Sequence, residues 1–202
     1  MEKINIVLRE LKEKIITRKD LDSLAEKYKF NKNSLRKLLL NKDYLVTIFR
    51  GVYYLRSYEE KKFNTIKYSP YELLSKGLEI KGVRWYFGLN TAIKFLNLTH
   101  EVFPINIVIN DKFNRIRPMK IAGTGFFFIK IKPSLFFGIN KIKTKNNIVL
   151  NHSNLEKTLL DLVYLKKNVD LEEYKFNEPI FLKYLSKYDK TTKKKVKEVL
   201  KY

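Results

Sequence analysis

Amide and cationic side chains recur along one short segment of the chain, residues 31–42. In a helix with 100° between successive residues, Leu35, Leu38 and Leu39 form an apolar stripe, and the polar side chains lie on the opposite side. Asparagine and arginine each form paired hydrogen bonds that suit the edges of adenine and guanine in a DNA major groove. The predicted base contacts come from Asn33, Arg36 and Lys37, with Asn41 flanking them.

The next segment, LVTIFRGVYYL at residues 45–55, has the pattern of two strands joined by a tight turn at Arg50-Gly51. Glycine readily adopts the positive φ that such a turn requires. An arginine at the tip of a hairpin can reach a phosphate or a minor groove. Contacts with the DNA backbone or the minor groove are therefore predicted for Lys32, Lys42 and Arg50.

Three helices are predicted before this hairpin. The first covers residues 4–14, the second follows a capping box of Thr17 and Asp20, and the third is capped by Asn31 or Asn33. Three helices and a hairpin within about 55 residues follow the order of a winged helix-turn-helix domain. We therefore predict a DNA-binding domain over residues 1–58. The competing interpretation is a small helical domain whose hairpin only covers its core, or which binds protein.

A polar connector is predicted over residues 59–69, followed by a second domain over residues 70–202. Pro70 suits the first turn of a helix, and Ser153 with Glu156 has the pattern of another capping box. A further helix is predicted over 89–98, strands within 105–110, 124–132 and 146–151, and two short helices from about 177. The fold class is therefore α+β: an N-terminal winged helix-turn-helix, then an α+β domain with a small, mostly antiparallel sheet.

The charge balance indicates a polyanionic partner. The chain has 42 Lys and Arg against 21 Asp and Glu, a formal net charge of +21. Nucleic acid is the first candidate and an anionic membrane surface the second, although an A+T-rich genome would also favour lysine. A second basic surface, for further phosphates or an RNA, is predicted from Arg115, Arg117, Lys141, Lys143 and Lys145.

Other chemistry finds little support in the sequence. Cysteine is absent, and no apolar run approaches the roughly 20 residues of a membrane span, so we expect a cytoplasmic protein without membrane contact. His100 and His152 lack acidic or histidine partners at ligand spacing. Asp161 could act as a general base, but without an obvious partner a helix-surface or structural hydrogen-bonding role is favoured. We expect no metal, no cofactor and no enzymatic activity.

Three segments taken together resemble a known family. They are LVTIFRGVYYL, then WYFGLNTAIKFLNLTH, then HSNLEKTLLDLVYL, and their order and spacing are similar to those of the AbiE-type antitoxins (AbiEi family) over approximately residues 1–167. The family's late helix resembles Glu-Arg-Thr-Leu-Leu-Asp, so Lys157 replaces the more usual arginine, which weakens any claim of a bidentate contact there.

The resemblance implies an antitoxin and transcriptional autorepressor of a viral-defence operon. Its winged helix would bind double-stranded operator DNA. Its C-terminal domain would counter a nucleotidyltransferase-like toxin encoded alongside, without a stable direct complex. The alternative function is a non-catalytic protein-binding winged-helix module that sequesters a partner. A nucleic-acid-processing enzyme is disfavoured because the sequence lacks an acidic cluster.

Overall fold

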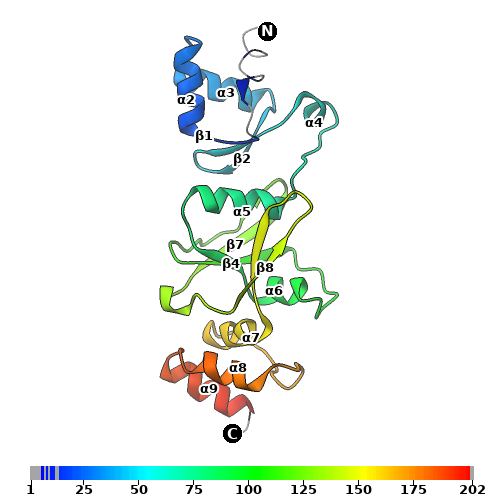
Figure 1. Cartoon of the computed structure of the whole chain (residues 1–202), viewed down its shortest axis with the longest axis vertical. Coiled ribbons are helices and arrows are strands. Elements are labelled where there is room, and N and C mark those ends of the chain that lie inside the picture. Colours follow the sequence, from blue (N-terminus) through cyan, green and yellow to red (C-terminus); the bar gives the residue numbers. More distant parts are fainter. Residues whose placement is uncertain (1–5, 7, 9, 12–13, 201–202) are drawn as a thin grey trace. The chain divides into compact units, whose positions relative to one another are not determined.

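The computed structural model describes residues 6, 8, 10, 11 and 14–200, so the helix expected over residues 4–14 lies largely outside the described residues. The described chain combines eight α-helices with two β-sheets, which confirms the α+β class (Figure 1). It divides into two compact units. The first unit comprises the chain up to Gly82 together with Ile121–Gly123. The second unit comprises Val83–Lys120 and the chain from Thr124 onward.

Two capped helices near the start of the first unit contribute to its core. Helix α2 spans Arg18–Lys27, and Thr17 and Asp20 form the predicted capping box at its start. Helix α3 spans Lys32–Asn41, and the Asn31 side chain, not that of Asn33, accepts the capping hydrogen bond. Their apolar faces form one core with the sheet of this unit. The core residues from these helices are Leu21, Leu24, Ala25, Leu35 and Leu39.

A three-stranded antiparallel sheet completes this core. Strands β2 (Leu45–Phe49) and β3 (Val52–Leu55) form the predicted hairpin, and Gly51 has the expected positive φ, 81°. Strand β1 (Ile15–Thr17), which the sequence analysis did not predict, pairs with β3, giving the order β1-β3-β2. The Gly51 carbonyl accepts a hydrogen bond of 2.9 Å from the Arg18 amide, which ties the turn to the start of α2.

The segment predicted as a connector is anchored to the first unit. It contains a short helix, α4 (Tyr58–Lys62), whose Glu60 carboxylate accepts hydrogen bonds from the Tyr54 hydroxyl, the Lys14 ammonium and the Lys67 amide. Burial by itself raises the pKa of Glu60, but these bonds and one from the amide of Ser57, the N-cap of α4, lower it to about 2.

Helix α5 (Pro70–Ile80) follows and belongs to the same unit, with Pro70 in its first turn as predicted. It packs so closely on β2 that a Cβ on Gly77 would lie 2.7 Å from atoms of Ile48 and Phe49. The division between the units falls after Gly82, which is later in the chain than the predicted connector of residues 59–69.

The sheet of the second unit has the strand order β6-β7-β5-β4-β9-β8. Its strands are β4 (Trp85–Phe87), β5 (Ile105–Asn110), β6 (Met119–Ile121), β7 (Thr124–Lys130), β8 (Ile139–Lys143) and β9 (Val149–Ser153). β4 pairs with β5 and β8 pairs with β9 in antiparallel fashion, whereas β4–β9 and β5–β7 are parallel. The sheet is therefore mixed, with two antiparallel and two parallel pairings among these strands, a balance that alternation along a strand does not specify.

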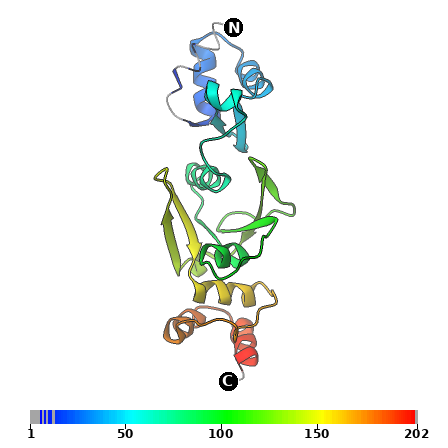
Figure 2. The same ribbon diagram turned by 90° about the vertical axis from the view of Figure 1, so that its right-hand side faces the viewer.

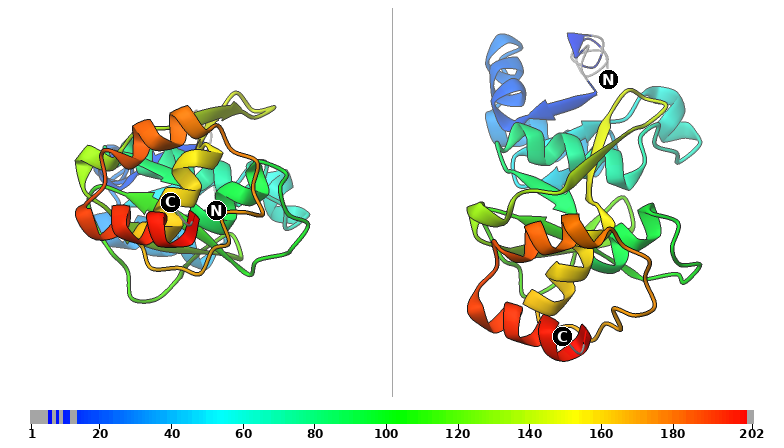
Figure 3. Two further views of the ribbon diagram at one scale, coloured as in Figure 1. Left: turned by 90° about the horizontal axis from the view of Figure 1, so that it is seen from below. Right: turned by 60° about the horizontal axis from the view of Figure 1, so that its bottom comes forward.

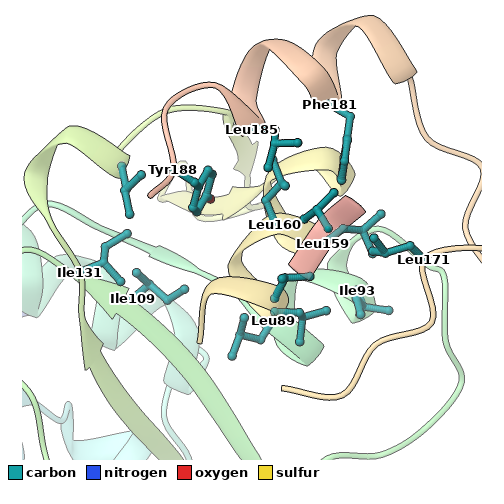
Figure 4. Packing of buried hydrophobic residues seen from close by; sticks show 14 of the residues in the cluster. Leu89, Ile93, Ile109, Ile131, Leu159, Leu160, Leu171, Phe181, Leu185 and Tyr188 are labelled. Atoms are coloured by element: carbon teal, nitrogen blue, oxygen red, sulfur yellow. The ribbon is translucent and has the colours of Figure 1, made fainter. Parts of the chain in front are cut away.

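Helices cover one side of this sheet in two layers. α6 (Leu89–Phe95) packs on α7 (Leu155–Tyr164), and α7 packs in turn on α8 (Glu178–Leu185) and α9 (Lys190–Leu200) (Figures 2 and 3). Side chains from these helices interlock in one apolar core (Figure 4). α6 ends earlier than predicted, because Asn97 adopts a positive φ of 56°. The two helices of the tail are confirmed.

The start of α7 corrects one prediction. Ser153 is not the N-cap: it is the last residue of β9, and its hydroxyl lies 2.6 Å from that of Thr158. The cap is Asn154, whose side chain accepts a hydrogen bond from the Lys157 amide. The predicted capping box of Ser153 and Glu156 is therefore wrong, because the extended backbone of β9 continues through Ser153 and the helix begins one residue later.

A charged pair lies in the middle of the second core. Lys157 and Asp161 on α7 form an ion pair although both side chains are completely buried. The Tyr86 hydroxyl of β4 and the Tyr188 hydroxyl each donate to Asp161 at 2.7 Å, and the Lys157 ammonium donates to Tyr188 at 2.8 Å. These bonds link a central strand, α7 and the segment between α8 and α9.

The first prediction concerns acid stability. Because the folded-state pKa of Glu60, about 2, lies below its ordinary 4.5, this carboxylate stabilises the fold fully above about pH 5 and loses that effect as the pH falls toward 2. Glu60→Gln should cost on the order of 2 kcal/mol at neutral pH, after allowance for partial exposure. It should also flatten the acid dependence in denaturant melts. Glu59→Gln, at the exposed neighbouring position, is the control, and an equal loss there would contradict this account.

The second prediction concerns the buried pair. Lys157→Met leaves a buried carboxylate without its cation, and Asp161→Asn leaves a buried ammonium without its anion. Each change should therefore cost about 3–5 kcal/mol of unfolding free energy. The double variant should cost clearly less than the sum of the two. The exposed pair of Lys194 and Glu198 on α9 has the same spacing, and the matching changes there should alter stability by less than about 1 kcal/mol. Additive losses at residues 157 and 161 would refute the coupling.

Candidate nucleic-acid interface

The exposed face of α3 presents the side chains that were predicted to contact bases. Asn33, Lys37 and Asn41 are exposed and four residues apart, so they follow one another along one side of the helix. Arg36 is half-buried beside this face, and Lys42, the C-terminal cap residue, is also half-buried. The side chain of Lys32 lies outside the described part of the structure.

A groove lies beside this helix, with a volume of about 690 Å³. It is lined by the start of α2, by Arg36 of α3, by the hairpin turn and by the end of α5. Five of its lining residues are cationic: Arg18, Lys19, Arg36, Arg50 and Lys81. The structure thus brings together Arg36 and Arg50, which the sequence analysis had placed on separate elements. It adds Arg18, Lys19 and Lys81, which that analysis missed.

Few carboxylates balance this groove. The ion pair found there within the described residues joins Arg18 and Asp22, with 3.5 Å between Nε and Oδ2. Lys81 donates to the Arg50 carbonyl at 2.9 Å, which leaves its charge uncompensated. The Nε of Arg36 is buried and has no hydrogen-bond partner in the described part of the chain. A bound anion would relieve the repulsion among the five cations.

The second predicted basic surface is divided between two places in the sheet. Arg115 and Arg117 lie in the loop between β5 and β6, which is bonded to β7 through the Arg115 amide and the Phe128 carbonyl, 3.1 Å apart. Lys141 and Lys143 lie on β8, and Lys145 in the turn after it. Three strands separate β7 from β8, which corresponds to on the order of 20 Å. The structure therefore does not gather these five cations into one surface.

The titratable residues of the second unit have structural surroundings. Asp161 is completely buried, and both of its oxygens accept hydrogen bonds, which supports a structural role and does not place it on the helix surface. Burial lowers the pKa of His152, whose ring stacks on Phe95, and His100 is exposed. The described residues contain no group of three potential metal ligands. They also contain no helix with the length and apolar character needed to cross a membrane.

No protein-family model matches the sequence, and no curated protein matches it either. The chemistry of the α3 face and of the cationic groove therefore carries the functional argument.

The third prediction tests whether the groove binds anions. Arg36→Met keeps an apolar stem but removes one of five mutually repelling cations, so the free protein should melt at an unchanged or higher temperature. Added inorganic phosphate should stabilise the wild type more than this variant, because binding to the folded state raises stability by mass action. Lys37→Met on the exposed face of α3 is the control. Equal stabilisation by phosphate in all three proteins would exclude the groove as an anion site.

Proposed function

We propose that this chain is a DNA-binding transcriptional repressor that serves as the antitoxin of a toxin–antitoxin operon. The observation that carries the DNA-binding part is a single arrangement in the first unit. A helix with exposed amide and lysine side chains borders a groove that contains five cations. Proteins that read DNA combine the same two elements, base-reading side chains and cations for the phosphates.

The order of elements supports a winged helix-turn-helix. Four residues separate the end of α2 at Lys27 from the start of α3 at Lys32, which is a turn length typical of this motif. The β2–β3 hairpin follows and would be the wing, with β1 as a third strand against β3. In this assignment α3 is the recognition helix, and its polar face enters the major groove.

Each side chain then has a role set by its chemistry. Asn33 and Asn41 would form paired hydrogen bonds with adenine edges, and Lys37 would contact bases beside them. The groove cations, Arg36 and Arg50 among them, would neutralise backbone phosphates. The role of Arg36 therefore changes from the predicted base contact to a phosphate contact, because its half-buried position in the groove favours a phosphate over a base edge.

The antitoxin part of the proposal rests on the resemblance to the AbiEi family. In this proposal the second unit counters a nucleotidyltransferase-like toxin encoded in the same operon, and the first unit represses that operon. The two activities should therefore separate genetically.

The fourth prediction tests this separation. The double variant Asn33→Ala/Asn41→Ala should lose its preference for DNA upstream of its own reading frame, by about 1–3 kcal/mol per lost base contact, and keep its affinity for scrambled DNA. Arg50→Ala should weaken binding to both DNAs and reduce the slope of log affinity against log salt by about one unit. Fluorescence anisotropy at two salt concentrations measures both effects. The double variant should still protect cells that produce the toxin.

Lys94→Ala on α6 removes an exposed charge far from α3 in the sequence and serves as the control. Wild-type affinity for the upstream DNA in all variants would refute the contact surface and favour the protein-binding module. Retained DNA binding without protection from the toxin would refute the antitoxin role alone.

A further inference from the structure

The loop between β5 and β6, residues 111–118, is held rigidly at its base. Asn110 is completely buried, and its Oδ1 accepts hydrogen bonds from the amides of Lys112 and Phe113 at 2.9 and 2.8 Å. Its Nδ2 donates to the carbonyl of Phe113 at 2.8 Å and to that of Ile129 at 3.2 Å. One buried side chain therefore fixes the first turn of the loop to the neighbouring strand.

Three further contacts fix the next residues to β7. The Phe113 ring packs against Phe128 with 5.3 Å between centroids. The Asn114 side chain accepts a hydrogen bond from the Lys130 amide, and the Arg115 amide donates to the Phe128 carbonyl at 3.1 Å. The backbone that leads to the tip is therefore ordered before any partner arrives, which lowers the entropy cost of binding.

The tip presents an isoleucine between two arginines. The Ile116 side chain is 97% exposed, more than any other large hydrophobic residue among those described, and Arg115 and Arg117 are both exposed. Residues 111–120 contain four cations and a single acid. That acid, Asp111, is paired with Arg84, with 3.0 Å between Oδ2 and Nε. The tip is therefore strongly positive around one apolar side chain.

We propose that this loop inserts into the minor groove of DNA, as a second contact in addition to the α3 face. The two guanidinium groups would enter the negative potential of a narrow groove, and Ile116 would wedge between adjacent base pairs and unstack them. The inference rests on the proposed DNA-binding function and extends it to the second unit. Tethering two weak contacts in one chain raises the overall affinity without any new interaction at α3.

An anionic membrane is the other surface that attracts cations next to an apolar residue. Stable membrane binding by a surface segment requires a broad apolar face, as in an amphipathic helix. This loop offers one isoleucine, whereas a minor-groove wedge requires only one apolar side chain. The chemistry of the tip therefore favours DNA.

The fifth prediction uses the full chain and short duplexes with an A·T-rich or a G·C-rich centre. Arg115→Ala/Arg117→Ala should weaken binding to the A·T-rich duplex on the order of tenfold or more and reduce the salt slope by up to about two units. Lys141→Ala/Lys143→Ala removes the same charge from β8 and should have a much smaller effect. Equal losses in the two double variants would overturn the proposal in favour of general electrostatic attraction.

The wedge has its own readout. Wild-type protein should raise the fluorescence of 2-aminopurine placed in the A·T-rich centre, because this base brightens when it is unstacked. Ile116→Ser should abolish that rise with little change in the salt slope, whereas Val102→Ser, at another exposed apolar position of the same unit, should not. An unchanged rise with Ile116→Ser would exclude the wedge.

Two outcomes separate this inference from the function on which it rests. If the wild type binds no duplex, both the proposed function and the loop contact fail. If the wild type binds DNA and loses affinity through the groove variants but not through the loop variants, the loop contact alone is refuted. Sedimentation with vesicles of anionic phospholipid that depends on Ile116, without loop-dependent DNA binding, would instead assign the loop to a membrane.

Discussion

The second unit depends on a buried ion pair. The ammonium of Lys157 and the carboxylate of Asp161 are both removed from water, which costs several kcal/mol per ion unless each charge is paired and hydrogen-bonded. Burial lowers the pKa of Lys157, and the adjacent Asp161 opposes that shift. Burial also raises the pKa values of Tyr86 and Tyr188, so both hydroxyls remain neutral donors to the carboxylate. The aromatic rings of Tyr86, Phe137 and Tyr188 surround the ammonium at 5.1–5.3 Å and add cation–π attraction.

These requirements fix the surrounding architecture. The hydroxyl of Tyr86 reaches Asp161 only when α7 lies against the centre of the sheet. That of Tyr188 reaches it only when the chain turns back between α8 and α9. The tail helices are therefore an integral part of the second unit rather than an appendage. In the first unit, Glu60 likewise links separate segments of the chain. Its carboxylate accepts hydrogen bonds from β3 and from the chain on either side of α4.

Net charge alone does not define a binding surface. Lysine and arginine occur throughout the chain, yet the structure concentrates them in two kinds of place with different chemistry. In the groove of the first unit, five cations lie close together and one guanidinium nitrogen has no partner among the described residues. In the loop of the second unit, two arginines flank an exposed isoleucine on a rigid base. The first arrangement suits the phosphates of a nucleic acid. The second suits the narrow minor groove of DNA.

The sequence by itself determined the features that depend on near neighbours in the chain. The capping box of Thr17 and Asp20, the glycine turn after Arg50, the proline at the start of α5 and the polar face of α3 all follow from local geometry. Tertiary structure decided the features that require distant residues to meet. The pairing of β1 with β3, the mixed sheet, the position of Lys81 in the groove and the burial of Lys157 belong to this class. A lysine four residues before an aspartate has the same sequence pattern on an exposed helix as in a core. Only the packing of β4, α7 and the tail removes that pair from water, because burial is a property of the whole unit.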